Sequence, residues 1–186
     1  MITDFDDYLI HQAALPINQT GIVNRNAYDR YWFNGFDKSG TFLFEMALGR
    51  YPNRFVQDAP FSVAIDGVQH SFHASRRTPD NPMESSVGPL RVEVVKPKRV
   101  IRFVIEPNET EVECDLTFHA KAPPVQEPKN HMWDGSRLIM DTQRFTQYGT
   151  WEGYVSVKGR RVEVERSQVI GNRAKSGGMR PVGEYE

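Results

Sequence analysis

The stretch TEVECDLTFHAKA, residues 110–122, decides the fold. Apolar and polar side chains alternate along it with a period of two. Successive side chains of a β-strand point to opposite faces, so this spacing predicts a strand with one dry and one wet face. The apolar members of the alternation are Val112, Cys114, Leu116, Phe118 and Ala120.

Working outward, eight further runs have the length and patterning of strands. Residues 41–48, for example, place Phe42, Phe44, Met46 and Leu48 on one face, which indicates a strand buried on that side. Together with residues 110–122 they make about nine strands in a chain of 186 residues. The eight runs are residues 31–36, 41–48, 61–65, 69–76, 90–95, 99–106, 146–157 and 161–165.

Short polar turns connect most of these runs. Asp66-Gly67 and Lys158-Gly159 are typical of tight hairpins, and residues 37–40, 96–98 and 107–109 are similarly short. No ten-residue amphipathic helix fits between the strands, so a parallel α/β sheet is disfavoured. An antiparallel sandwich or barrel is left, and the long strands favour the barrel because closure removes exposed edges. The predicted fold class is therefore an all-β, antiparallel β-barrel.

The two ends of the chain differ from the middle. Phe5, Tyr8 and Leu9 have helix-like spacing within residues 3–15, which predicts a short N-terminal helix before Pro16. Residues 171–186 are rich in glycine and poor in apolar side chains, which is typical of an exposed tail or a truncated linker. The predicted division is a helical segment and linker over 1–23, a barrel over 24–170 and a tail over 171–186. Residues 80–88 and 121–135 are predicted loops.

Composition excludes several classes of protein. The 23 Lys and Arg nearly balance 24 Asp and Glu, so no strong positive field attracts nucleic acid. No apolar run approaches the 18 or so residues of a membrane span. The N-terminal segment MITDFDDYLI lacks the basic start of a signal peptide, and the single cysteine, Cys114, suits a reducing compartment. We therefore expect a soluble cytoplasmic protein.

Metal and thiol chemistry are not indicated. Of the five histidines only His70 and His73 are close in sequence, and on a strand an i, i+3 pair points to opposite faces. Cys114 alternates with apolar residues, so it is predicted to be a buried small hydrophobe. No phosphate-binding or dinucleotide-binding glycine motif is present. We expect no metal and no other cofactor.

Two segments could form a ligand site. In the first, GRYPNRFVQDA (residues 49–59), polar groups that include Arg50 and Tyr51 follow a Phe-rich strand. Such groups often converge at the mouth of a barrel. The alternative is a rigid loop in which Arg54 and Asp58 form a surface ion pair.

The second segment runs from Asp141 through Arg144 and Tyr148 to Trp151. Strand spacing places Gly149, Trp151 and the residues at 153, 155 and 157 on one face. Glycines beside a large aromatic ring on an inward face can leave room for a ligand. The alternative is that Trp151 plugs the barrel.

The chain resembles a known family at these segments. The stretches YWFNGFDKSGTFLFEMALGRYPNRFVQDA (residues 31–59), DTQRFTQYGTWEGYVSVKGRRVEV (141–164) and RPVGE (180–184) are similar to the lipocalin-like AttH proteins and carotenoid 1,2-hydratases, or hydroxyneurosporene synthases. The resemblance runs from about residue 24 to 184. It implies calycin-type β-barrels, usually two in tandem, of which this chain would be the N-terminal half. A departure lies at residues 173–180, where an Arg-Asp-Arg-Ser-Trp-Gly type motif of the family lacks its acid and its tryptophan.

Three functions follow as hypotheses. The barrel binds a hydrophobic terpenoid, lipid or steroid-like molecule; or it acts as a hydratase-like lyase, which needs a carboxylic acid kept protonated by an apolar site; or it is a noncatalytic domain that pairs with a second copy or a second barrel. For catalysis we expect Asp141 as the acid, with Glu45 and Asp58 as other candidates. The predicted ligand-binding residues are Tyr31, Trp32, Arg50, Tyr51, Arg144, Tyr148 and Trp151.

Overall fold

The computed structural model describes residues 13–181 and is almost entirely antiparallel β-sheet. A single turn of 3-10 helix, η2 (Pro52–Arg54), interrupts the strands. The described part of the chain contains no helix long and apolar enough to cross a membrane. The strands are β1 (Ala27–Asp37), β2 (Phe42–Tyr51), β3 (Val56–Ile65), β4 (Val68–Arg77), β5 (Ser86–Val87), β6 (Leu90–Lys96), β7 (Val100–Ile105), β8 (Val112–Ala120), β9 (Val125–Gln126), β10 (Asn130–Asp134), β11 (Arg137–Val157), β12 (Arg160–Val164) and β13 (Val169–Met179).

All nine predicted strands are present, and the alternation that predicted them sorts their side chains. In β8, Val112, Cys114, Leu116 and Phe118 are buried while the residues between them are partly exposed. Strand β3 alternates in the same way along its whole length. The predicted turn at Asp66-Gly67 joins β3 to β4, and both of its residues have the positive φ of a tight hairpin turn.

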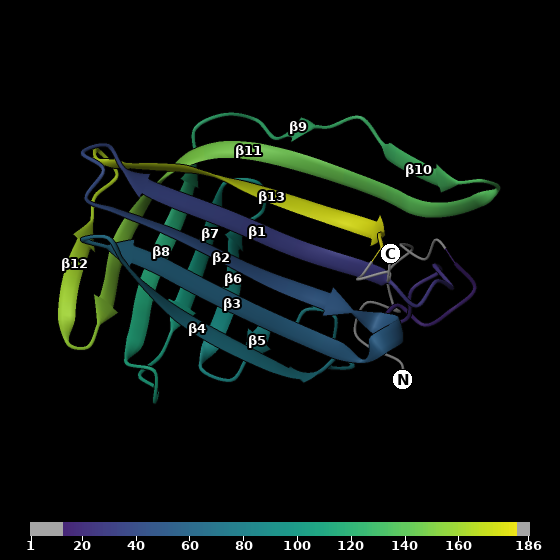
Figure 1. Cartoon of the computed structure of the whole chain (residues 1–186), viewed down its shortest axis with the longest axis horizontal. Helices are drawn as coiled ribbons and strands as arrows, with labels where there is room; N and C mark the ends of the chain where they lie inside the picture. The colour runs from purple at the N-terminus through teal and green to yellow at the C-terminus, as the bar shows by residue number, and fades with distance from the viewer. Residues whose placement is uncertain (1–12, 182–186) are drawn as a thin grey trace.

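The sheet curls into a nearly closed barrel, with β1, β2, β3, β4 and β13 on one wall and β6, β7 and β8 on the other (Figure 1). Hydrogen-bonded neighbours run in the order β4-β3-β2-β1-β13-β11-β8-β7-β6-β5. The two ends of this path, β4 and β5, face each other across a seam. Side chains bridge the seam: Gln57 Nε2 donates to the carbonyl oxygens of Glu84 and Ser86 at 3.2 and 3.1 Å, and Arg76 pairs with Glu84.

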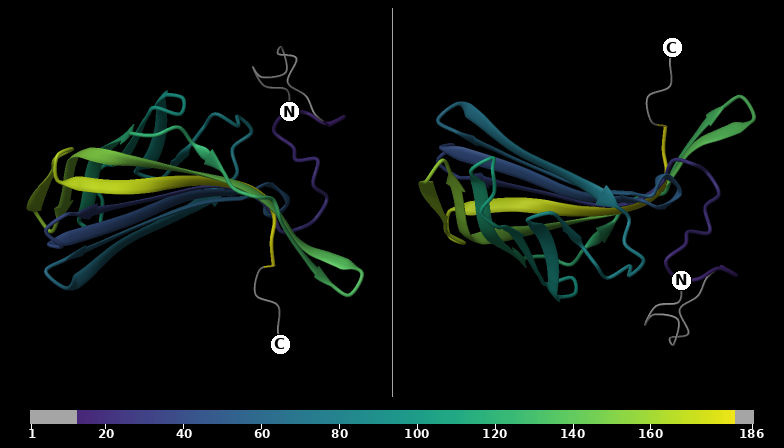
Figure 2. Two further views of the ribbon diagram at one scale, coloured as in Figure 1. Left: turned by 90° about the horizontal axis from the view of Figure 1, so that it is seen from above. Right: turned by 90° about the horizontal axis from the view of Figure 1, so that it is seen from below.

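Four short or late strands were not predicted. Strand β5 lies in the predicted loop 80–88, and β9 and β10 lie in the predicted loop 121–135, where both pair with the long strand β11. The turn between β10 and β11 projects beyond the barrel as a two-stranded ribbon (Figure 2). The N-terminal helix predicted over residues 3–15 falls mostly outside the described residues, and residues 13–15 are not helical.

The prediction of an exposed tail from residue 171 is wrong as far as Met179. These residues continue β13, which pairs with β1 on one side and with β11 on the other, from Ala27↔Met179 to Asp141↔Met179. Hydrogen bonds from two neighbouring strands hold this backbone in place despite its low apolar content. Residues 182–186 lie outside the described part of the chain.

Candidate ligand-binding site

The floor of the barrel is filled by aromatic rings. Trp151 on β11 is fully buried, and its ring lies edge-on to Phe33, Phe44 and Phe118, with centroids 5.9, 5.3 and 5.2 Å away. Its indole Nε1 donates a hydrogen bond to the backbone oxygen of Asn34 at 2.8 Å. A buried tryptophan needs such a partner for its N–H. Of the two alternatives for Trp151, the structure supports the one in which it plugs the barrel.

The glycines around Trp151 serve this packing. A Cβ added at Gly149 would lie 2.4 Å from Cζ of Phe118, and one at Gly171 would lie 2.0 Å from the carbonyl oxygen of Asn34. Both distances are far below van der Waals contact. The space that the missing side chains leave is therefore occupied by the protein's own rings and backbone, and a ligand has no room there.

The mouth of the barrel, in contrast, is hollow. A cavity of about 420 Å³ lies between β1, β2, β6, β13 and the loop before β5. A second cavity of about 310 Å³ shares Asp29, Arg50, Pro82 and Lys175 with it and extends beneath residues 17–22. Asn53 holds that segment through hydrogen bonds from Nδ2 to the backbone oxygens of residues 22 and 24. The first cavity is lined by Asp29, Arg30, Tyr31, Leu48, Arg50, Pro82, Met83, Ser85, Val92, Glu93, Val94 and Lys175.

Arg50 stands at the rim of this cavity and is held by neutral acceptors. Its Nε and Nη2 donate to Oε1 of the fully buried Gln57 at 3.0 and 2.9 Å, and Nη2 also donates to the backbone oxygen of Glu84. Burial lowers the pKa of the Arg50 guanidinium, although the charge of Asp29 partly opposes this effect. Asp29 itself forms an ion pair with Lys175. Arg50 is thus a cation fixed in position without a carboxylate partner among the described residues.

Deeper in the barrel, Arg173 on β13 is a second such cation, and it was missed by the sequence analysis. It is 4% exposed, and its Nε donates to Oε1 of Gln147 at 2.8 Å. Gln147 is anchored by two bonds from Nε2 to the carbonyl oxygens of Lys98 and Ala122. The guanidinium also lies over the ring of Phe145, with Cζ 5.2 Å from the centroid. Burial lowers the pKa of Arg173.

The sequence-predicted ligand residues are distributed over three places. Tyr31 and Arg50 meet at the mouth, and Trp151 lies in the floor. Trp32 and Arg144 lie on the outer face, in a groove of about 540 Å³ beneath residues 127–130. Tyr51 lies near Asp58 on the face of the sheet opposite to the inward Gln57, and Tyr148 is 62% exposed.

Asp141, the predicted catalytic acid, also lies apart from the mouth. Its Oδ1 is 2.8 Å from Nζ of Lys129 and 3.1 Å from Nε2 of His131. The hydrogen bond from Lys129 is the main cause of a lowered pKa for this carboxyl group. Such an environment favours the ionised form, whereas protonation of an alkene requires a protonated acid. The geometry gives no support to Asp141 as the proton donor.

Of the two other acids, Asp58 has the environment of a proton donor, because burial raises its pKa, but it too faces outward. Glu45 lies on the outward side of β2, beside Trp32. The mouth cavity is lined by two acidic residues, Asp29 and Glu93. Asp29 forms an ion pair with Lys175, and Glu93 forms ion pairs with Arg91 and Arg102.

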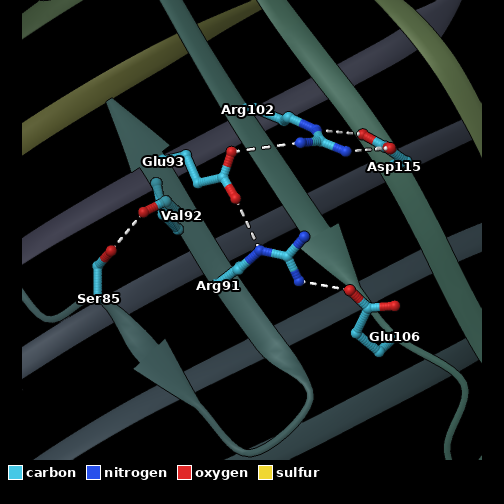
Figure 3. A network of polar contacts seen from close by, with 7 residues as sticks. All are labelled: Ser85, Arg91, Val92, Glu93, Arg102, Glu106 and Asp115. Carbon is cyan, nitrogen blue, oxygen red and sulfur yellow. Dashed lines mark hydrogen bonds and ion pairs between the residues drawn. The ribbon is translucent and has the colours of Figure 1, made fainter. Parts of the chain in front are cut away.

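Charged side chains on the outer face of β6, β7 and β8 are paired with opposite charges more completely than those in the mouth. Figure 3 shows a ladder in which Arg102 binds both carboxylate oxygens of Asp115, at 2.8 and 2.6 Å, and also contacts Glu93. Arg91 links Glu93 to Glu106. The hydrogen bond from Arg102 lowers the pKa of Asp115. Every charge in this ladder has an opposite partner, which is the arrangement that the mouth lacks.

Comparison with solved structures shows the fold. The chain is similar to kievitone hydratase from Nectria haematococca, with a TM-score of 0.58, 14% identity and coverage of 81% of this chain and 48% of that one. It is also similar to CghA, solved with Sch210972 (TM-score 0.54, 11% identity, 82% and 46% covered) and without it (0.54, 13%, 82% and 46%). These likenesses show the fold alone, an all-β lipocalin-like barrel. The chain spans about half the length of these proteins.

A search of curated proteins gives no match. One family model matches residues 2–186, which is nearly the whole chain. Its description is a family of unknown function (DUF8625). The chain therefore belongs to this family, DUF8625.

Proposed function

We propose that this barrel binds a small apolar molecule in the cavity at its mouth. The observation that carries the proposal is the contrast between a floor packed with rings and a cavity of about 420 Å³ directly above it. That volume falls in the range of roughly 300–1,000 Å³ typical of ligand pockets. Tyr31, Leu48 and Val92 supply apolar wall, and such walls give most of the binding free energy.

The class of ligand follows from the lining and from the family resemblance. A cavity with apolar walls and a few fixed polar groups suits a terpenoid, lipid or steroid-like molecule whose one polar end is oriented by hydrogen bonds. The similarity of residues 31–59 and 141–164 to AttH proteins and carotenoid 1,2-hydratases supports the same class. Arg50 is the polar anchor at the rim, because its neighbours already hold it in place.

A matched pair of variants tests the site. Leu48 is 5% exposed and lines the cavity, whereas Leu43 on the same strand is 53% exposed on the other face. We expect Leu48→Trp to fill the cavity and to weaken binding of the neutral fluorescent probe N-phenyl-1-naphthylamine by about tenfold or more, while Leu43→Trp leaves it unchanged. Mass spectrometry of organic extracts of the purified protein would identify a natural ligand. Equal affinity in both folded variants would contradict the proposal.

A hydratase-like reaction is a second candidate, because one of the similar solved structures is kievitone hydratase. Such a reaction would use the same cavity, and its carboxylate Asp29 would have to leave the ion pair with Lys175 before it could donate a proton. Incubation of the protein with its extracted ligand in ¹⁸O-labelled water tests this function. Incorporation of ¹⁸O that is lost in Asp29→Asn would support hydration, and an unlabelled, unchanged ligand would reject it.

An interaction role is a third candidate, favoured by the ribbon of β10 and the start of β11. The ribbon projects from the barrel (Figure 2), and Met132 and Trp133 on it are 47% and 61% exposed. The partner in this proposal is a second copy of this barrel. Sedimentation velocity should then show a dimer that Trp133→Ser dissociates. A wild-type monomer at high protein concentration would reject this role.

A further inference from the structure

The inward-facing charges at the mouth do not balance. Arg50, Arg173 and Lys175 are cations, and Asp29 is the carboxylate that faces them. Asp29 is engaged by Lys175. Neither Arg50 at the rim nor Arg173 deeper in the barrel forms an ion pair with a carboxylate among residues 13–181, although Asp29 pairs with Arg50 across β1 and β2. A cavity beside two such cations would attract an anion.

Arg173 is the more informative of the two, because it is almost completely buried. Its Nε is used by Gln147, but no acceptor among the described residues lies within hydrogen-bond distance of its two terminal nitrogens. These nitrogens are not among the fully buried side-chain atoms that lack a partner, so they border open space although the residue as a whole is 4% exposed. The structure therefore contains a cation with two N–H groups available for a ligand.

The position of Arg173 connects it to the cavity. It precedes Lys175 by two residues on the same face of β13, so Lys175, which lines the cavity, lies directly above it. On the neighbouring strand β1, Phe33 pairs with Arg173 and Tyr31 pairs with Lys175. Tyr31 also lies close enough to both Arg50 and Arg173 to interact electrostatically with each. Arg173 thus lies two residues deeper in the barrel than Lys175, next to the residues that line the cavity.

We propose that the ligand is an apolar acid, such as a carboxylate, phenolate or enolate, whose anionic oxygen binds Arg173 beneath Tyr31. Arg50 at the rim adds positive potential along the path of entry. This inference rests on the proposed function, because it assigns the class of ligand to the same cavity. It also explains why a guanidinium group lies directly above a floor made of aromatic rings.

Two probes that share one aromatic skeleton test the inference. 1-Anilinonaphthalene-8-sulfonate is an anion, and N-phenyl-1-naphthylamine is neutral. A hydrogen bond to a charged group contributes about tenfold to hundredfold in affinity. We therefore expect wild-type protein to bind the anion at least tenfold more tightly than the neutral probe. Arg173→Gln should remove this preference while changing affinity for the neutral probe less than about twofold.

The controls separate a charge in the site from charge elsewhere. Arg99→Gln removes an exposed arginine and should leave the preference intact. Arg173→Lys retains the charge and should restore most of it. Thermal unfolding shows whether each variant is folded, and the wild-type comparison of the two probes needs no variant at all.

Each outcome has a definite meaning. Tighter binding of the anion that depends on Arg173 supports the inference. If the neutral probe binds as tightly as the anion, and Leu48→Trp abolishes both, the cavity is a binding site but the assignment of an acid is overturned. If neither probe binds, the proposed function is overturned, and the inference with it.

Discussion

The floor and the mouth of this barrel are built by the same strands but serve different ends. In the floor, Phe44, Phe118 and Trp151 meet at ring-centroid distances of 5.2–5.3 Å, and glycines make room for them. In the mouth, inward-facing positions carry Arg50 and Lys175 together with Tyr31, Leu48 and Val92 around a cavity. The alternation of apolar and polar residues therefore predicts which side chains point into the barrel. It does not predict whether the interior at that level is packed or contains a cavity.

Charges sharpen this comparison further. On the outer face, Arg102 is matched by Asp115 and Glu93, and the ladder is complete. Inside the mouth, Arg173 has a neutral amide as its side-chain partner. The outer ladder is complete within the chain, whereas the proposal of an anionic ligand rests on the incomplete pairing of Arg173.

The largest effect is expected from truncating the floor. Trp151→Ala removes a fully buried side chain and leaves the Asn34 carbonyl without its donor, so it should lower the free energy of unfolding by about 3–5 kcal/mol. Urea denaturation measures the change. Trp133→Ala, at a tryptophan that is 61% exposed, is the matched control and should cost less than about 0.5 kcal/mol. A Trp151→Ala protein as stable as the control would show that the floor is not a packed core.

A smaller effect is expected when glycine is replaced by alanine, once in the floor and once at the mouth. In the floor, the methyl group of Gly149→Ala would collide with Phe118 and with a backbone oxygen, so we expect a loss of about 1–3 kcal/mol. At the mouth, the methyl group of Gly177→Ala would meet its nearest neighbours at 3.5 Å, an ordinary contact. That variant should raise the free energy of unfolding by less than about 1 kcal/mol, because alanine reduces the conformational freedom of the unfolded chain. If thermal unfolding showed the same loss of stability in both variants, the distinction between a packed floor and an open mouth would be contradicted.

The smallest effect concerns the outer charge ladder. Asp115 and Arg102 are 33% and 37% exposed, so Asp115→Asn should cost about 0.2–1 kcal/mol at pH 7 and less at high salt. The folded pKa of Asp115 lies below its ordinary value of 3.8. Its contribution is therefore present above that value and lost as the pH falls through the folded pKa. Urea titrations of both proteins from pH 7 to pH 3 should converge, and a constant gap would contradict this account.

Much of the fold could be predicted because it rests on local patterns. Residues 110–122 alternate strictly, residues 41–48 carry an apolar residue at every second position, and hairpins join neighbouring runs, so nine strands and their antiparallel pairing follow from the sequence. Strand β13 could not be found in this way. Its Gly177 and Gly178 have little preference for a strand, and the backbone is held by partners about 40 and 150 residues away in the chain, as in Asp141↔Met179 and Ala27↔Met179.

The predicted ligand-binding residues lie in different parts of the molecule. Tyr31 and Arg50 do meet at the mouth, since both follow the inward period of their strands. Trp32 and Arg144 point to the opposite face of the sheet. Neighbouring residues of a strand face opposite sides, so this placement follows once the inward-facing positions are known to the exact residue. Arg173 is not among the predicted residues because the high glycine and low apolar content of residues 171–186 predicts a tail instead of a strand. The signal that could have found it is its spacing from Gly171 and Val169, which are both buried on the same face.

The seam between β4 and β5 has a consequence for motion. Elsewhere along the barrel wall neighbouring strands are joined by backbone ladders, but here Gln57 and Arg76 supply side-chain bonds instead. Amide protons on the seam side of β4 should therefore exchange with solvent faster than those of β13, which is paired on both sides. Gln57 also holds Arg50, so a local opening of the seam between β4 and β5 would loosen the rim of the mouth cavity. The proposed ligand would then enter through the barrel wall while the aromatic floor stays folded.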